Sequence, residues 1–534
     1  MTLGRTYGVG LVGLDGRMVE IEADIGQTLP AFVLLGLPDA SLNEARDRVR
    51  SAARNAGLPL SRRKITVNLM PADVPKRGSG FDLAIVTAAL AASGDVRGSG
   101  RRVFIAELAL DGRLRPVRGI LPAVMAAVQA GYPEITVAAA NTAEASLVSG
   151  AEVTGFESLA EVAAFLGADP GRLSFPPRVS EDTPNPDDDA GAAGVPPLRD
   201  MADIAGQTEA RFAVEVAAAG AHHLLMTGPP GAGKTMLAER LPGLLPDLPD
   251  SHAMEVTAIH SLVWGGRPCS QLLRRPPFES PHHTASSAAV IGGGAGIARP
   301  GAASRAHRGV LFLDEAPEYD RRVLDALRQP LESGKLELHR AAGTASYPAR
   351  FQLVLAANPC PCGLASGKGI DCTCTPQQRR RYFSRLSGPL LDRVDLQLTV
   401  QRVSLRELAG DDSAEGSAVV AARVAAARDV QHDRLKGWGY ETNAEVSGNV
   451  LRGALRPAPQ ATAALDRAMD RQTLTARGYD RVLRVAWSVA DLAGHSSPDA
   501  DDVGQALGFR QQEQRHERAA AGAAPEPRRA VPVV

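Results

Sequence analysis

The sequence predicts an α/β protein organised around a parallel β-sheet, and three short apolar runs support this fold class. Residues 223–227 lead into a glycine-rich loop and then into a helix-forming run at 236–240. Residues 309–313 end in two acidic residues, and residues 351–357 end in an asparagine. Buried parallel strands have this form, with polar residues at their carboxyl ends. We therefore expect one edge of the sheet to carry the chemistry.

The glycine-rich loop fits the phosphate-binding pattern G-x-x-x-x-G-K-[ST]. Its glycines let backbone N–H groups turn inward around phosphate oxygens, and the helix N-terminus adds positive potential. The lysine would reach the β- and γ-phosphates, and the threonine would hold Mg²⁺. The alternative is a glycine–proline turn that fits by chance, which the flanking strand and helix disfavour. The predicted site for ATP and Mg²⁺ comprises Gly228, Pro229, Pro230, Gly231, Ala232, Gly233, Lys234 and Thr235.

The other two apolar runs supply candidate catalytic residues. Asp314 would bind Mg²⁺ through water, and Glu315 would polarise the attacking water. The amide of Asn358 could orient that water, although Asn358 could also be only a turn residue before Pro359. An acidic pair after a strand says little alone. After a phosphate loop, it predicts ATP hydrolysis.

Bulk composition leaves the macromolecular partner open. The 534 residues suggest about two to four domains. Lys plus Arg number 59 and Asp plus Glu 60, so a surface for nucleic acid must be a local patch. No apolar run approaches membrane-spanning length, and the N-terminus lacks a charged-then-apolar leader. We therefore expect a cytoplasmic protein without a membrane partner, and five cysteines suit a reducing compartment.

Residues 1–172 are expected to form a mixed α/β domain. Apolar and acidic residues alternate over 19–25, as in a half-buried strand, and residues 65–69 alternate similarly. The pair Asp15-Gly16 has the composition of a hairpin turn. Helices are expected at 81–92 and 121–130.

The rest of the chain divides by composition. Residues 173–197 are rich in Pro, Asp and Gly, which predicts a disordered linker. The nucleotide-binding domain is expected at 198–403 and a helical domain at 404–510. Residues 511–534 are expected to form a disordered tail. In the helical domain, helical spacing predicts a core-facing stripe formed by Val482, Val485, Ala486, Val489 and Leu492.

Several further segments occur in a characteristic order: residues 203–207, 280–284, 291–294, 299–301, 358–363 and 387–393. Together with the phosphate loop, they resemble the ComM/YifB family of magnesium-chelatase-like AAA+ ATPases over about residues 1–510. The resemblance implies a Mg²⁺-dependent ATPase with an AAA+ parallel sheet and a C-terminal helical lid.

The resemblance also implies roles for residues outside the phosphate loop. Asn358 would be the first sensor, and Arg393 the arginine finger that enters a neighbouring subunit's site. A guanidinium aimed at the γ-phosphate stabilises developing charge, and supplying it from a neighbour requires a ring. The resemblance implies that this ring is a homohexamer. Without the resemblance, Arg393 could be half of an ordinary surface ion pair. Arg477 resembles the second sensor, with Arg481 and Arg484 as rivals.

The N-terminal domain resembles the fold of the Lon protease domain. Segments 75–80 and 116–121 align with that protease's nucleophile and lysine segments. The alignment puts Gly80 at the nucleophile position and Leu121 at the lysine position, and neither supports covalent catalysis. Ser79 is adjacent to the nucleophile position, but the lysine is missing. We therefore expect no protease activity.

Two loops are candidates for contact with a substrate such as DNA. Residues 282–294 contain two histidines and three consecutive glycines, and residues 340–350 resemble a hairpin ahead of the first sensor. In a ring both would point at the central pore and contact a DNA backbone. The alternative is structural, with glycines shaping a turn and histidines capping a helix. A metal site at the histidine pair is disfavoured because no third ligand has evident spacing.

Four cysteines form the pattern C-x-C-x₉-C-x-C in a loop rich in Gly, Pro and Ser: Cys360, Cys362, Cys372 and Cys374. A tetrahedral Zn²⁺–thiolate site would order such a loop. Four idle thiols and redox chemistry are the alternatives, since C-x-C is less standard than C-x-x-C. Cys269 stands alone and is expected to be structural.

The favoured interpretation is a ring-forming ATPase that remodels or translocates on DNA, with branch-migration or helicase-like activity in recombination or DNA uptake. The resemblance alone supports the DNA activity. One alternative is the ATPase motor subunit of a metal chelatase. The other is a nucleotide-switched assembly scaffold without DNA activity.

Overall fold

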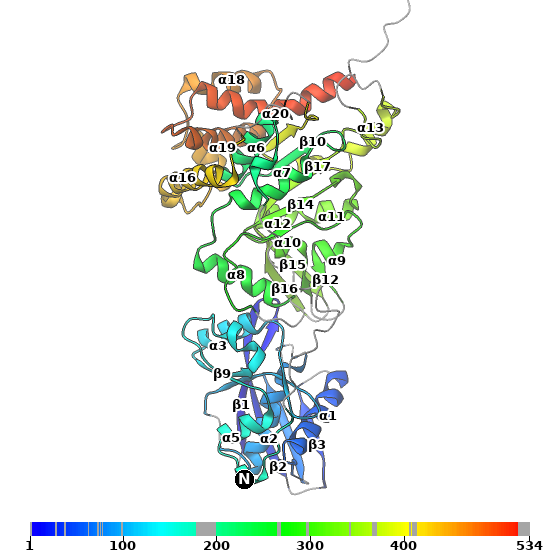
Figure 1. Cartoon of the computed structure of the whole chain (residues 1–534), viewed down its shortest axis with the longest axis vertical. Helices are drawn as coiled ribbons and strands as arrows, with labels where there is room; N and C mark the ends of the chain where they lie inside the picture. The colour runs from blue at the N-terminus through cyan, green and yellow to red at the C-terminus, as the bar shows by residue number, and fades with distance from the viewer. Residues whose placement is uncertain are drawn as a thin grey trace, which may run out of the picture.

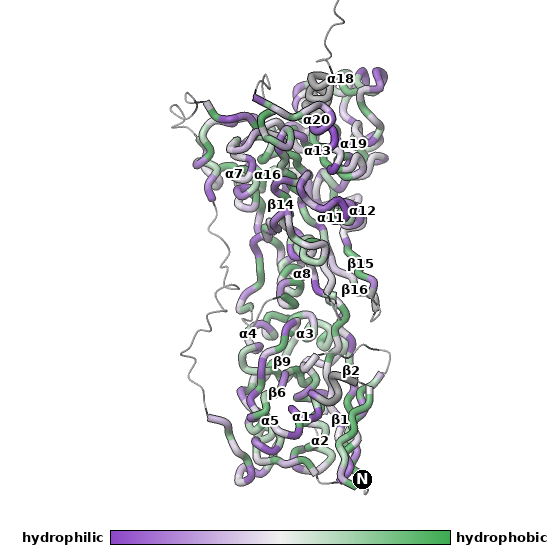
Figure 2. Tube along the Cα trace, turned by 90° about the vertical axis from the view of Figure 1, so that its right-hand side faces the viewer, coloured by the Kyte–Doolittle hydropathy of each residue, from purple (hydrophilic) through white to green (hydrophobic). Residues whose placement is uncertain are grey.

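The computed structural model shows a long molecule in which the N-terminal domain occupies one end and the C-terminal helices the other (Figure 1). A second view, turned by a quarter, shows the same stacking along the long axis (Figure 2). The structure describes residues 3–26, 29–36, 39–61, 63–71, 74, 76, 78–97, 100–177, 199–263, 269–294, 298–340, 343–365, 371–404, 407 and 414–521.

The N-terminal domain is built on a seven-stranded mixed sheet in the order β3-β4-β2-β1-β5-β8-β9. Helices α1, α2 and α5 pack on one face of this sheet, and α3 and α4 pack on the other. Its strands are β1 (Gly4–Val12), β2 (Asp15–Gly26), β3 (Phe32–Leu35), β4 (Lys64–Met70), β5 (Val103–Ile105), β8 (Glu134–Ala138) and β9 (Glu152–Phe156), beside the small pair β6 (Glu107–Leu108) and β7 (Leu114–Arg115). Its helices are α1 (Asp39–Asn55), α2 (Asp82–Ser93), α3 (Ile120–Gln129), α4 (Thr142–Ala145) and α5 (Leu159–Phe165).

The predicted alternation at 19–25 and 65–69 lies in β2 and β4, where every second residue is buried. The helices predicted at 81–92 and 121–130 are α2 and α3, each displaced by one residue. The hairpin prediction was wrong in register, because Asp15 and Gly16 already belong to β2. The turn consists of Gly13 and Leu14, and Gly13 supplies the left-handed φ of 67° that a tight turn needs.

The second domain carries a five-stranded parallel sheet in the order β11-β14-β17-β10-β18. Its strands are β10 (Leu224–Thr227), β11 (Phe278–Glu279), β14 (Val310–Leu313), β17 (Gln352–Ala357) and β18 (Leu396–Thr399), with the pairs β12 (Gly292–Gly293)–β13 (Arg299–Pro300) and β15 (Lys335–Arg340)–β16 (Gly343–Pro348). Its helices are α6 (Thr208–Gly220), α7 (Lys234–Arg240), α8 (Asp250–Ser261), α9 (Ser287–Val290), α10 (Ala302–Arg305), α11 (Arg321–Ala326), α12 (Arg328–Ser333), α13 (Pro376–Phe383) and α14 (Gly388–Leu391).

The C-terminal region is helical and shares one continuous core with α6 and the parallel sheet. Its helices are α16 (Ser417–Leu435), α17 (Gly448–Arg452), α18 (Pro459–Asp470), α19 (Ala476–Ala493) and α20 (Ala500–Ala521). Within α19 the predicted stripe is buried at Val482, Val485, Ala486 and Val489. Helix α20 extends through the first eleven residues of the expected tail, to Ala521. The rest of that tail, and 178–197 of the expected linker, lie outside the described residues.

Apolar contacts join the N-terminal domain to the second domain. Val12 and Leu14, at the β1–β2 turn, pack against Tyr347 of the β15–β16 hairpin. Ala258 of α8 lies in the core that α3 covers, and the Gly119 N–H donates to the Ser261 carbonyl at 3.0 Å. The hairpin predicted to contact a substrate at 340–350 is therefore also a docking surface for the N-terminal domain; residues 341–342 at its tip are not described.

Among the residues that the structure describes, no helix is both long and apolar enough to cross a bilayer.

Candidate nucleotide site

The phosphate loop lies where β10 ends and α7 begins, at the carboxyl edge of the parallel sheet. Gly231 and Gly233 have φ values of 74° and 87°, a conformation that glycine adopts without steric cost. Gly228 is constrained by space, because a Cβ there would lie 2.2 Å from the Val400 carbonyl oxygen. The glycines predicted from the motif are thus required by the backbone at these positions.

Lys234 is buried beneath its own loop. Its Nζ donates to the Gly228 carbonyl at 2.6 Å, to the Pro229 carbonyl at 3.1 Å and to Asn358 Oδ1 at 3.2 Å. Burial lowers the pKa of the Lys234 ammonium, and the nearby charges of Asp314 and Glu315 oppose that shift. The structure therefore brings the motif lysine and the predicted first sensor into direct contact.

Thr235 and Asp314 form the second contact of the site. The Thr235 hydroxyl donates to Asp314 Oδ2 at 2.8 Å, although 79 residues separate them in the chain. A hydroxyl and a carboxylate are hard oxygen ligands of the kind that Mg²⁺ binds together with phosphate. This donor set fits Mg²⁺, and Thr235 and Asp314 would hold it.

Glu315 follows Asp314 in a left-handed conformation with φ 49°, which is strained for a non-glycine residue. Its carboxylate lies 3.2 Å from Nδ1 of His283. Sequence reasoning missed this contact, because it placed His283 in a loop that meets a substrate. No local sequence pattern links residues 32 positions apart, so the contact between His283 and Glu315 is visible only once the loop after β11 is packed against the site.

Gln207 is a second residue whose part in the site was missed. Its side-chain amide donates to the Ala232 carbonyl of the phosphate loop at 2.6 Å, from a backbone with φ 52°. In the sequence, segment 203–207 carries only the family resemblance. A polar residue just before a helix could equally be a cap, so the sequence carried no signal for this role.

Arg393 lies at the opposite edge of the same sheet. It ends the turn after α14 and precedes β18, whose first residue Leu396 pairs with Leu224 of β10. Its guanidinium contacts Glu332 and the Pro389 carbonyl. Burial lowers the pKa of Arg393, and so does repulsion from neighbouring guanidinium groups, those of Arg328, Arg481 and Arg477.

The three candidates for the second sensor also lie away from the phosphate loop of their own chain. Arg477 is largely exposed and pairs with Asp392 at 3.0 Å, beside Arg393. Arg481 pairs with buried Asp395 at 2.9 Å, and Arg484 donates to the Val446 carbonyl at 2.8 Å. Of the three, Arg477 has the side chain most available to a second molecule.

The two segments that align with a protease site do lie side by side. A Cβ on Gly80 would come 3.7 Å from Cγ1 of Val117. Leu121 is completely buried in α3, and the Ser79 hydroxyl donates to Glu107. The prediction of no protease activity and the likeness to the Lon domain both stay predictions.

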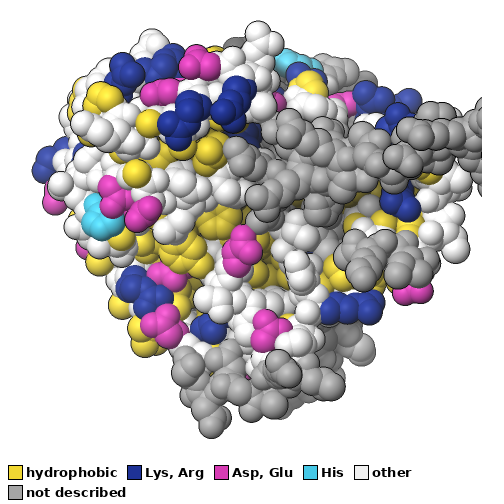
Figure 3. Space-filling model, turned by 90° about the horizontal axis from the view of Figure 1, so that it is seen from above, with side chains coloured by type: hydrophobic (Ala, Val, Ile, Leu, Met, Phe, Trp, Pro, Cys, Tyr) yellow, Lys and Arg dark blue, Asp and Glu magenta, His cyan; other side chains and the backbone are white. Residues whose placement is uncertain are grey.

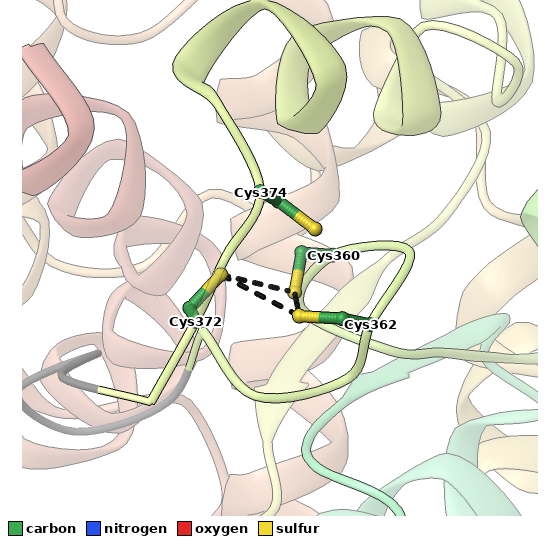
Figure 4. A group of neighbouring side chains, drawn as sticks. All are labelled: Cys360, Cys362, Cys372 and Cys374. Carbon is green, nitrogen blue, oxygen red and sulfur yellow. Dashed lines mark hydrogen bonds between the residues drawn. The ribbon is translucent and has the colours of Figure 1, made fainter.

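The four clustered cysteines converge in space. Cys360 and Cys362 follow β17, Cys372 and Cys374 precede α13, and their sulfur atoms point at one another (Figure 4). Cys269 is buried and separate from them, and burial raises the pKa of its thiol to about 12.

Comparison with known proteins identifies the family. Models for magnesium chelatase match three parts of the chain: subunit ChlI over residues 200–408 and 21–141, and the ChlI C-terminal part over 414–510. The chain is 41% identical over 513 residues to the competence protein ComM of Haemophilus influenzae, covering 96% of this chain and 98% of that protein. The chain belongs to the ComM/YifB family of magnesium-chelatase-like proteins. This AAA+ family implies ATPase activity.

Other relatives of the family match over similar lengths. An uncharacterised protein of Mycobacterium tuberculosis is 51% identical over 516 residues, covering 96% of this chain and 99% of that protein. The uncharacterised protein YifB of Escherichia coli is 40% identical over 499 residues, covering 92% and 94%. The likeness to ComM and YifB thus includes the N-terminal domain.

Proposed function

We propose that the protein is a Mg²⁺-dependent ATPase whose subunits form a ring and remodel DNA. The observation that carries the ATPase site is the convergence of Lys234 with Asn358 and of Thr235 with Asp314 at one edge of the sheet. Mg²⁺ bound there would neutralise charge on the phosphates. Thr235 and Asp314 are preorganised for it, so little ordering is needed on binding.

Each residue of the site has a distinct part in this proposal. Lys234 exchanges its bonds to the loop carbonyls for bonds to phosphate. Glu315 accepts a proton from the attacking water, and Asn358 orients that water. In the structure described here Glu315 is held by His283, so the catalytic arrangement requires its carboxylate to leave that contact.

A ring is supported by the position of Arg393. The phosphate loop follows Thr227, which pairs with Thr399 at the end of β18, whereas Arg393 precedes that strand. The four-residue strand alone separates the two edges by about 10 Å. Arg393 therefore lies at the opposite end of β18 from the phosphate loop of its own chain, and we propose that it reaches the nucleotide of a neighbour in a homohexamer.

The arginines around Arg393 favour an anionic partner at that edge. The buried Nε atoms of Arg328, Arg393 and Arg481 have no hydrogen-bond partner within the described part of the chain. Unpaired buried donors are costly, and phosphate oxygens of the ATP bound to a neighbouring subunit would accept hydrogen bonds from them. Arg477, exposed beside Arg393, would face the same phosphates and act as the second sensor there.

The proposal that the ring acts on DNA is supported mainly by kinship. A relative that matches over almost its full length is named a competence protein. At the helical end of the molecule, basic and acidic side chains are intermixed (Figure 3), in line with the balanced charge of the whole chain. We therefore propose that DNA contacts the loops at 282–294 and 340–350, which in a ring would face the pore.

ATP turnover with and without branched DNA tests this function. A DNA-remodelling motor should hydrolyse ATP faster with branched than with linear DNA at equal nucleotide concentration. A rate of ATP hydrolysis that is the same with and without DNA would favour the motor subunit of a metal chelatase. ATP binding without turnover would favour the assembly scaffold.

A further inference from the structure

The cysteine loop after β17 has a geometry that neither ATP hydrolysis nor action on DNA explains. We propose that Cys360, Cys362, Cys372 and Cys374 bind one Zn²⁺ through four thiolates. All four sulfur atoms lie within 4.8 Å of one another, and Cys360 is completely buried. The site is separate from the proposed Mg²⁺ ligands, and its existence does not depend on the proposed function.

The spacing of the sulfur atoms matches a tetrahedral zinc centre. The Cys360–Cys362 pair is 3.3 Å apart, and each of these sulfurs lies 3.6 Å from that of Cys372. Four ligands at a Zn–S distance of about 2.3 Å in tetrahedral geometry lie about 3.8 Å from one another. These three sulfurs therefore require only a small expansion to hold the ion. The sulfur of Cys374 lies within 4.8 Å of each of them, and none of the four cysteines is in a disulfide.

Local structure brings the two C-x-C pairs together from opposite ends of the loop. Cys360 begins a tight turn, in which its carbonyl accepts the Gly363 N–H at 2.9 Å. Cys374 directly precedes Thr375, which caps α13 through a capping box with Gln378. The first pair is thus fixed to β17 and the second pair to α13. Contacts between thiols are weak and would stabilise this arrangement of four sulfurs very little. Metal binding would stabilise it, because the free energy of metal binding contributes to folding.

The zinc loop also supports the phosphate loop. Gly363, with φ 77°, approaches Pro230 so closely that a Cβ would lie 2.6 Å from Cγ of the proline. Asn358, which contacts Lys234, is two residues before Cys360. Zinc would therefore hold both the first sensor and one wall of the phosphate loop in place. This second part rests on the proposed function.

Metal analysis of the full-length protein, purified without a metal-affinity step and supplied with Zn²⁺, tests the site itself. We expect about one zinc per chain. Cys372→Ser should lose most of it, while Cys269→Ser, the matched control outside the cluster, should retain it. Replacement by Co²⁺ should give the visible absorption of a tetrahedral cobalt–thiolate centre. Protein that has been supplied with Zn²⁺ but contains no zinc and has four freely titratable thiols at these positions would overturn the proposal.

A second measurement separates the zinc site from the ATPase. Gly363→Ala leaves all four thiolates in place and should retain one zinc per chain. Because its Cβ would push against Pro230, it should weaken ATP binding by about tenfold. If Gly363→Ala retains its zinc and both this variant and zinc-depleted wild-type protein bind ATP with unaltered affinity, the supporting role is overturned and the metal site stands. If the protein proves not to be an ATPase, the zinc content should still be one ion per chain, so the two proposals can fail independently.

Discussion

Catalysis across the subunit boundary can be tested by mixing two inactive variants. Lys234→Ala removes the phosphate-binding lysine and leaves Arg393 intact, whereas Arg393→Ala does the reverse. Arg393→Ala alone should lose about 10³-fold or more in turnover, because an arginine finger contributes that much in related mechanisms. Lys234→Ala alone should lose a similar factor or more, because its phosphate loop no longer holds ATP. The Arg393→Ala protein should still bind ATP, since Arg393 and the phosphate loop lie at opposite edges of the sheet.

The expected recovery follows from the geometry. If a site combines Lys234 of one subunit with Arg393 of its neighbour, an equal mixture of the two variants restores both groups in about one quarter of the sites. If both groups act within one chain, no site is restored, because no chain carries both. Mixed rings should therefore regain up to about a quarter of wild-type turnover when sites act independently.

A second mixture provides the control. The double variant, mixed equally with wild-type protein, should leave about a quarter of sites intact under action in trans and about half under action in cis. Two affinity tags, one on each protein, would verify co-assembly before turnover is measured. Co-assembled rings of the single variants with no recovered activity, together with half-activity in the control, would refute action in trans.

Further predictions concern single residues. Glu315→Gln should bind ATP normally and hydrolyse it at least about 10²-fold more slowly, measured by filter binding and phosphate release; near-normal turnover would remove Glu315 from the mechanism. His283→Ala should raise basal turnover without altering ATP affinity if the contact with Glu315 restrains the carboxylate, and unchanged basal turnover would exclude that restraint. Lys234→Ala should lose ATP affinity itself in equilibrium binding, and unchanged affinity would contradict the phosphate-loop assignment. Burial lowers the pKa of His223 to about 4, and its Nδ1 accepts the Leu353 N–H, so the folded state disfavours protonation. Its contribution to stability should be complete above pH ~6.5 and decline as the pH falls toward 4, so denaturant midpoints should fall less over this range in His223→Gln than in wild type.

The features that the sequence predicted correctly are those encoded by short-range patterns. Alternation of apolar and polar residues identified β2 and β4, and a helical period identified the buried stripe on α19. The predicted turn at Asp15 and Gly16 failed by two residues, because Gly13 can adopt the same left-handed conformation and the pairing of β1 with β2 selected it. Composition gave no sign that α20 would continue into the expected tail as far as Ala521.

For the candidate site, the sequence by itself determined which residues we propose to carry the chemistry. The phosphate loop, Asp314 and Asn358 each follow an apolar strand, and parallel pairing brings the ends of such strands to one edge. Tertiary structure alone decided which atoms meet there. The contacts of His283 with Glu315 and of Gly363 with Pro230 join residues far apart in the chain, and the position of Arg477 beside Arg393 depends on how the helical region packs. Strand pattern and loop conformation are set by neighbouring residues, whereas these contacts depend on the packing of whole elements, which no local spacing encodes.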